Sequence, residues 1–264
     1  MAYKLLDAVT AVGTSKSISI GNGILNHVID CVFNSTATTE ISAVVIKLQG
    51  SETNEDAVNG IVTEAALAVG STAENVATGA FECRVNDVHV TKAAVVAGTA
   101  LTAGLDRLSS TVGDYKITAS KFGGFKMYID ASGNIKFSYP ALQQAYNTIA
   151  LANSAVDDLP RTIDDGTKYI AIGKVLIEND GTEWVAATDD LTGASDVTSI
   201  AFISLGSSFI DLQTRTFTSE ELANARSSFV TADQGSAYIR VYLSTLTGTG
   251  EVICRYTPFS VMEN

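Results

Sequence analysis

The stretch "SAYIRVYLS" (residues 236–244) alternates apolar and polar side chains, and this alternation decides the fold class. Successive side chains of an extended strand point to opposite faces, so every second residue shares a face. The face expected to point inward carries aliphatic residues: Ile239, Val241 and Leu243. The face expected to point outward carries Tyr238, Arg240 and Tyr242. Such a pattern is typical of a half-buried antiparallel strand.

The same period of two runs through much of the chain. In "SAVVIKLQGS" (42–51), Val44, Ile46 and Leu48 share one face, and Val45, Lys47 and Gln49 share the other. Further strands are expected at 4–10, 16–20, 27–34, 80–91, 114–119, 125–130, 134–139, 168–178, 182–188, 197–204 and 250–258. The sequence therefore predicts a mainly β protein built of two or three antiparallel sandwich-like or barrel-like units.

Three turns carry recognisable chemistry. "NDGT" (179–182) predicts a two-residue hairpin between strands 168–178 and 182–188, with Asp180-Gly181 at positive φ. "DASGN" (130–134) predicts a longer hairpin with Gly133 in the left-handed region. "LTGTGE" (246–251) predicts a glycine-bearing connection between the last two strands.

Two segments are expected to be helical. After Pro140, the segment 141–159 places Leu142, Tyr146, Ile149 and Val156 near one face, which predicts one helix in the middle of the chain. A shorter helix is expected at 219–226, because Thr218 and Glu221 have the spacing of a capping box.

Small and polar residues suggest where the chain divides. We expect an N-terminal β domain over 1–78, a middle domain with the helix over 79–205, and C-terminal strands over 206–264. The C-terminal strands either form a third unit or pack back on the N-terminal domain, which would leave the middle as an insertion.

The charge balance bears on partners. Seventeen basic residues stand against 29 acidic ones, for a formal charge of −12. A nucleic-acid groove needs clustered Lys and Arg, and the sequence shows no such cluster. We also see no apolar run of the ~18 residues that a membrane span needs and no export signal. The expected place of synthesis is a cytoplasm.

The three cysteines, Cys31, Cys83 and Cys254, stand far apart in the sequence and form no CxxC pair. Each lies at an apolar position of an expected strand, so we expect reduced, buried thiols that act as small core residues. A disulfide or a crosslink between subunits is the less favoured alternative.

Signatures of catalysis or ligand binding are weak. His27 and His89 lack a second His or Cys at ligand spacing, and neither a G-x-S-x-G elbow nor a phosphate-binding glycine loop occurs. Three acidic pairs could serve as acid and base: Asp157-Asp158, Asp164-Asp165 and Asp189-Asp190. Adjacent strand residues face opposite ways, so turn and cap roles are favoured. Loose calcium binding in a loop is the alternative, and no D-x-[DN]-x-[DN]-G motif supports it. Trp184 is expected to be a core or edge residue, with a glycan or subunit contact as the alternative.

Residues 110–204 combine several motifs: "IDASGNI" (129–135), a helix ending in Leu159-Pro160, "DDGTKYIAIGKVLI" (164–177), Trp184, and "TDDL" (188–191). Through these motifs the middle of the chain resembles the head-decoration or head-fibre proteins of tailed-bacteriophage virions. "GAFECRVNDVHVTKAA" (79–94) is similar to the strand entering that module, and "VIKLQGSETNED" (45–56) is a weaker match to β-sandwich domains of phage structural proteins. The chain departs from the pattern at Trp184, where phenylalanine is more typical, and in its acidic helix end.

This resemblance implies a non-enzymatic virion protein with no catalytic, cofactor-binding or metal-binding residues. Its partner would be the lattice of the major capsid protein, and the protein would act as a homo-oligomer assembled in the host cytoplasm. We expect the contact surface in residues 1–20 and the final strands. The alternatives are a tail or baseplate component, a carbohydrate-binding adhesive module contacting sugars through Trp184, Tyr238 and Tyr242, and an acid-pair glycosidase.

Overall fold

A computed structural model of the chain confirms the mainly β fold class. Antiparallel pairing dominates its sheets, and two helices occur within the described ranges. The structure describes residues 3–11, 13–15, 18–20, 26–35, 40–51, 58–101, 115–164, 166–192, 197–208, 210–232 and 236–259.

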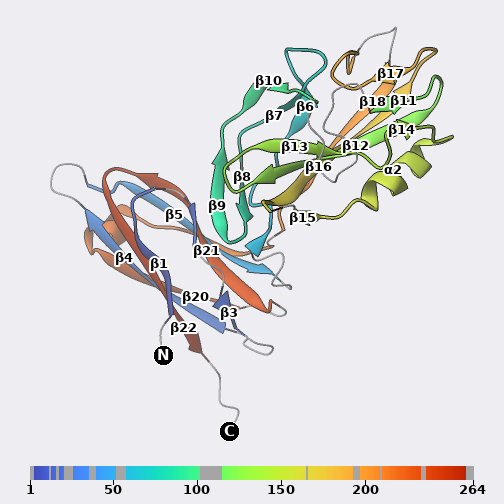
Figure 1. The fold of residues 1–264 in the computed structure, drawn as a ribbon. Helices are drawn as coiled ribbons and strands as arrows, with labels where there is room; N and C mark the ends of the chain where they lie inside the picture. Colours follow the sequence, from blue (N-terminus) through green and yellow to red (C-terminus); the bar gives the residue numbers. More distant parts are fainter. Residues whose placement is uncertain are drawn as a thin grey trace. The chain divides into compact units, whose positions relative to one another are not determined.

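The chain forms two compact units (Figure 1). Unit 1 comprises 1–58 and 208–264, and unit 2 comprises 59–207. Compared with the expected division, residues 59–78 belong to the middle unit. The C-terminal strands pair with the N-terminal ones, so unit 2 is an insertion in unit 1.

The strands described in unit 1 form a sandwich of two sheets. One sheet has the order β1 (Tyr3–Val9), β22 (Gly250–Phe259), β4 (Asn26–Ser35) and β20 (Arg226–Ala232). The other has the order β19 (Ile210–Thr216), β5 (Ala43–Ser51), β21 (Tyr238–Thr247) and β2 (Gly13–Thr14), with β3 (Ile18–Ser19) also on β21. Aliphatic residues of β5 and β21 share one core with residues of β4 and β22, as the alternation predicts.

The opposite face of β21 corrects one expectation. Arg240 and Tyr242 are buried, although the alternation placed them outward. Arg240 stands opposite Gln49 and donates from Nε to Gln49 Oε1 at 3.0 Å. Gln49 in turn donates to Asp211 Oδ1 at 2.6 Å, and Lys47 pairs with the other oxygen of Asp211. These cross-strand contacts give hydrogen-bond partners to polar groups whose burial without partners would destabilise the fold.

The described residues of unit 2 form four sheets. The largest has the order β13 (Ile135–Ser138), β12 (Phe122–Asp130), β16 (Lys168–Asn179) and β15 (Thr162–Asp164), with β18 (Val197–Ser204) also on β16. Three small sheets are β14 (Gln143–Gln144), β11 (Lys116–Ile117) and β17 (Trp184–Val185); β10 (Val95–Thr99), β7 (Val76–Thr78) and β6 (Leu67–Val69); and β8 (Phe81–Val85) with β9 (Val88–Lys92). Most of their buried side chains form one core, and Tyr128, Ile163, Tyr169 and Ala171 form a second, smaller cluster.

The helix of unit 2 is shorter than predicted. α2 spans Ile149–Asp157, and Thr148 caps its N-terminus. Residues before it are extended instead, because β14 pairs with β11 and Tyr146 bridges to Phe122. Ala152 and Val156 are buried, and Val156 packs beside Gly124 of β12. Leu142 and Ile149 are exposed, contrary to expectation.

Two lysines hold the C-terminus of α2 against the sheet. Lys126 Nζ donates to the carbonyls of Asp157 and Leu159 at 3.2 and 2.5 Å. Lys174 Nζ pairs with Asp157 Oδ1 at 2.5 Å. Positive charge at a helix C-terminus is favourable, so these contacts fix where α2 docks. Burial lowers the pKa of Lys126 from its ordinary value.

The turns divide into confirmed and wrong predictions. Gly133 has φ +82°, and α3 (Ser219–Ala223) carries the capping box of Thr218 and Glu221. The hydrogen bond from the Thr218 backbone holds the pKa of Glu221 at about 2. The predicted hairpin at 179–182 is wrong, because its two strands do not pair with each other. β16 pairs with β12, β15 and β18, and β17 pairs with β11. The φ angle of Gly181 also lies outside the left-handed region, in which the predicted turn would place it.

The segment expected as one strand at 80–91 is a hairpin. Asn86 and Asp87, between β8 and β9, both have positive φ, at 52° and 64°. Two positive φ values match the right-handed twist of a tight hairpin. The "ND" pair was therefore a turn signal that the apolar pattern obscured.

Candidate functional site

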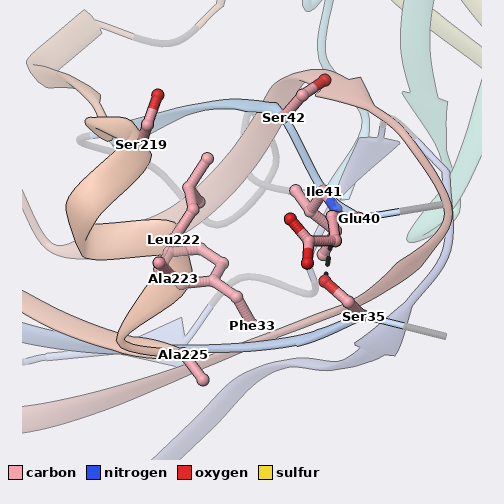
Figure 2. Close-up of a pocket in the computed structure, with 9 residues that line it drawn as sticks. All are labelled: Phe33, Ser35, Glu40, Ile41, Ser42, Ser219, Leu222, Ala223 and Ala225. Atoms are coloured by element: carbon pink, nitrogen blue, oxygen red, sulfur yellow. Dashed lines mark hydrogen bonds between the residues drawn. The ribbon is translucent and has the colours of Figure 1, made fainter. Parts of the chain in front are cut away.

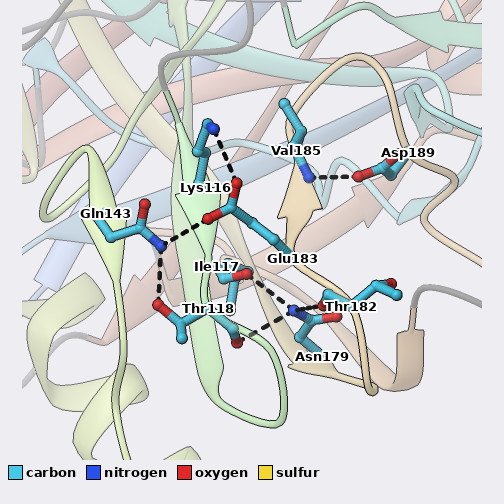
Figure 3. Close-up of polar contacts among 9 residues, drawn as sticks. All are labelled: Lys116, Ile117, Thr118, Gln143, Asn179, Thr182, Glu183, Val185 and Asp189. Atoms are coloured by element: carbon cyan, nitrogen blue, oxygen red, sulfur yellow. Dashed lines mark hydrogen bonds and ion pairs between the residues drawn. The ribbon is translucent and has the colours of Figure 1, made fainter.

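Trp184 is a core residue and not a surface contact. It is 1% exposed, and its Nε1 donates to the carbonyl of Asp190 at 3.2 Å. The chain returns to make this bond because Asp189 Oδ2 accepts from the Val185 amide at 2.6 Å, as Figure 3 shows. The stretch 184–190 is thus a closed turn built around the tryptophan. A glycan contact through Trp184 is excluded by its burial.

Beside this turn lies a polar network that joins the three short strands β14, β11 and β17 (Figure 3). Lys116 Nζ pairs with Glu183 Oε1 at 2.8 Å, and Gln143 Nε2 donates to Thr118 Oγ1 at 2.8 Å and toward Glu183 Oε2 at 3.4 Å. The hydrogen bond from Lys116 lowers the pKa of Glu183. A carboxylate held ionised by a lysine is poorly suited to donate a proton, so this network favours a structural role.

Asn179 anchors the turn that follows β16. Its Nδ2 donates to the carbonyls of Ile117, Thr118 and Thr182, at 2.9, 3.1 and 2.6 Å. Because a buried side chain from the end of β16 holds the start of this turn, the chain turns toward β11 and does not fold back along β16 (Figure 3).

The acidic pairs have turn and cap contacts. Asp157 accepts from Lys174 and from Asn153 at the end of α2, and Asp158 is the C-cap residue. Asp164 Oδ1 accepts from the Gly166 amide at 3.3 Å, while Asp165 lies outside the described residues. These are the roles that the sequence favoured over acid–base chemistry.

His89 contacts a hydroxyl and a carboxylate in an arrangement that differs from a catalytic triad. Thr91 Oγ1 lies 3.2 Å and Glu82 Oε2 lies 3.6 Å from the same ring atom, Nε2. A triad needs the base to bind the nucleophile with one nitrogen and the acid with the other. His27 Nδ1 lies 3.3 Å from Tyr256 Oη in the unit 1 core. Within the described ranges no group of three or more metal-ligating side chains occurs.

Unit 1 has a pocket between α3 and the C-terminal end of β4 (Figure 2). Its volume is about 420 Å³. Phe33, Ile41 and Leu222 supply apolar walls, and Ser35 Oγ accepts from the Ile41 amide at 3.2 Å. The one carboxylate in the lining is Glu40. This lining can hold a small apolar group, but it presents no nucleophile–base pair.

A different surface stands out in unit 2. Residues 141–156, "ALQQAYNTIALANSAV", contain no charged residue in a chain of formal charge −12. We call this segment the uncharged surface; the charged side chains of Glu183 and Lys121 border it, through hydrogen bonds with Gln143 and Asn147. Most of it is exposed, including Leu142 at 39%, Ile149 at 42% and Leu151 at 53%. Sequence reasoning missed it because the same apolar residues fit a helix face turned toward the core.

No helix among the described residues is long and apolar enough to cross a membrane. Comparison of the chain with protein families, with curated proteins and with solved structures finds no match.

Proposed function

We propose that the chain is a non-enzymatic structural protein of a tailed-bacteriophage virion, which docks on the assembled capsid and decorates or stabilises it. The proposal places the protein in the virion, assembled in the host cytoplasm as a homo-oligomer. It is supported by the sequence resemblance over 110–204 and by one feature of unit 2, the uncharged surface.

The uncharged surface is the observation that carries the proposal. Charged residues are depleted at the cores of protein interfaces, where desolvating them is costly. Leu142, Ile149 and Leu151 are large aliphatic side chains that remain in contact with water in the isolated chain. A protein partner that covers these side chains removes their apolar surface from water, which stabilises the complex by ~25 cal/mol per Å² of apolar area buried. A symmetric lattice repeats such a site, so an oligomer gains avidity from many weak contacts.

Residues 1–20 remain a predicted contact segment, but removing them is a poor test. β1 pairs with β22 over Tyr3–Val9, and β2 and β3 pair with β21. A truncation therefore strips strands from both sheets of unit 1 and lowers stability together with binding.

The rival assignments differ in what the structure offers them. An adhesive module that contacts sugars through Trp184 and Tyr242 gains no support, since both side chains are buried. Tyr238 alone of the three expected aromatic contacts is half-exposed. A tail or baseplate role uses the same kind of apolar contact and differs from decoration in copy number.

The test is binding of the purified protein to capsids that lack it, measured by co-sedimentation. Leu151→Lys places a charge on the uncharged surface, and Val96→Lys is the matched control at a 70% exposed valine of β10 in the same unit. We expect Leu151→Lys to weaken binding tenfold or more, about 1.4 kcal/mol, while Val96→Lys binds like the unmodified chain. Equal binding by all three proteins, with equal melting temperatures, would exclude the uncharged surface as the contact.

A further inference from the structure

Two of the three cysteines, far apart in sequence, are neighbours in unit 1. Cys31 lies on β4 and Cys254 on β22, directly opposite each other in the antiparallel register. Their Sγ atoms are 3.5 Å apart across a sequence separation of 223 residues, and both side chains are fully buried. Cys83 lies in the core of unit 2.

This placement fits the requirements of a disulfide. Directly opposed residues of antiparallel strands have Cα atoms about 4.5–5.5 Å apart, within the ~4.4–6.8 Å range that disulfides span. The sulfurs must approach to about 2.05 Å, which is a shift of roughly 1.5 Å that side-chain rotation can supply. The paired backbone already holds both residues in register, so no strand has to slide.

We infer that Cys31 and Cys254 are a latent disulfide site, reduced in a reducing compartment and joined when the chain meets a disulfide oxidant such as glutathione disulfide. One thiolate attacks the oxidant and releases the first glutathione thiol, leaving a mixed disulfide. The second cysteine thiolate displaces the second glutathione thiol and closes the Cys31–Cys254 bond. Two protons and two electrons leave the cysteines and appear in the two glutathione thiols.

The surroundings make this reaction slow in the folded chain. The hydrogen bond with Cys31 and burial raise the pKa of the Cys254 thiol well above its ordinary value. Thiolate, the reactive form, is therefore scarce until β4 and β22 separate.

The bond would have a topological consequence. Unit 2 lies entirely within the loop that Cys31 and Cys254 close, since it spans 59–207. A backbone cut anywhere in unit 2 would then leave the two halves of unit 1 covalently joined.

The experiment unfolds the reduced protein in urea and refolds it in buffers of reduced and oxidised glutathione, followed by thiol counting and peptide mapping. We expect the three free thiols of the chain to fall to one, with Cys31 and Cys254 in one crosslinked peptide and Cys83 free. Cys83→Ala should form the same crosslink, and Cys31→Ala should form none. The oxidised protein should also unfold at higher urea than the reduced one.

Either of two results would overturn the inference. One is refolded, native protein that retains three free thiols at every glutathione ratio. The other is a crosslink that includes Cys83. Both are read on the unmodified chain, so they hold even if a variant fails to fold.

Discussion

Replacing Asn179 with alanine removes the side chain that holds the turn after β16. Three carbonyls lose a hydrogen bond: the one on Ile117 is buried, and those on Thr118 and Thr182 are partly buried. The Thr118 carbonyl keeps the backbone amide of Lys121 as a donor. Each orphaned buried acceptor costs about 1–3 kcal/mol, less where water can replace the donor. The Oδ1 of Asn179 is buried and finds no hydrogen-bond partner among the described residues, so its removal offsets part of the loss. We therefore expect the substitution to lower the free energy of unfolding by about 2–3 kcal/mol.

The assay is thermal unfolding followed by tryptophan fluorescence. Trp184 is the only tryptophan of the chain, and it pairs with Ile117 on the strand that Asn179 anchors, so its emission reports on unit 2. The expected fall in melting temperature is about 5–10 °C for a unit of this size. Asn147→Ala is the matched control, because Asn147 is exposed and only accepts from Lys121. It should shift the melting temperature little.

The isosteric change Asn179→Asp sharpens the test. A carboxylate facing carbonyl oxygens favours its protonated form, so the folded pKa of this aspartate should lie above the unfolded value of about 3.9. Its contribution to stability is then present below pH ~4 and lost as pH rises through the raised folded pKa. The reasoning is refuted if Asn179→Ala has the same melting temperature as the unmodified chain, or if the stability of Asn179→Asp does not change with pH.

The remaining predictions concern backbone conformation, helix docking and a buried thiol. Gly133→Ala should lose about 1–2 kcal/mol, because Gly133 has φ +82°. Gly181→Ala should leave the free energy of unfolding unchanged or raise it by up to ~1 kcal/mol. Both sites have room for a methyl group. Equal urea midpoints for the two variants would therefore contradict the assignment of φ. Lys126→Met removes two hydrogen bonds to carbonyls at the end of α2 and should speed amide exchange in that helix, with unchanged exchange as the contrary result. Burial raises the pKa of Cys83 to about 12 from 9.0, so stability should fall as pH rises above 9, where the unfolded thiol ionises first. Cys83→Ala should lose this alkaline component, whereas Cys83→Ser should cost about 1–3 kcal/mol at neutral pH.

Local chemistry explains what could be predicted from the sequence. The inward residues of β21 are all aliphatic, so alternation alone identifies them. The turn at Gly133 and the capping box of Thr218 and Glu221 involve residues within a few positions of each other, and the structure contains both.

Long-range contacts explain the rest. Arg240 is buried because Gln49, on a strand almost two hundred residues away, accepts its hydrogen bond. The chain after Asn179 turns toward β11 because that side chain binds carbonyls some sixty residues earlier. Periodicity could not show that Leu142 and Ile149 remain exposed, since the same spacing serves a buried helix face and an interface. The uncharged surface was visible only as a gap in charge along the sequence.

The most direct test of the proposed function is a quantitative mass-spectrometric inventory of purified phage particles. Decoration predicts that the chain is present in high copy number, in a fixed ratio to the major capsid protein, and that it is released as an intact oligomer. A few tens of copies per particle would instead assign it to the tail. Its absence from purified particles would contradict the virion assignment altogether.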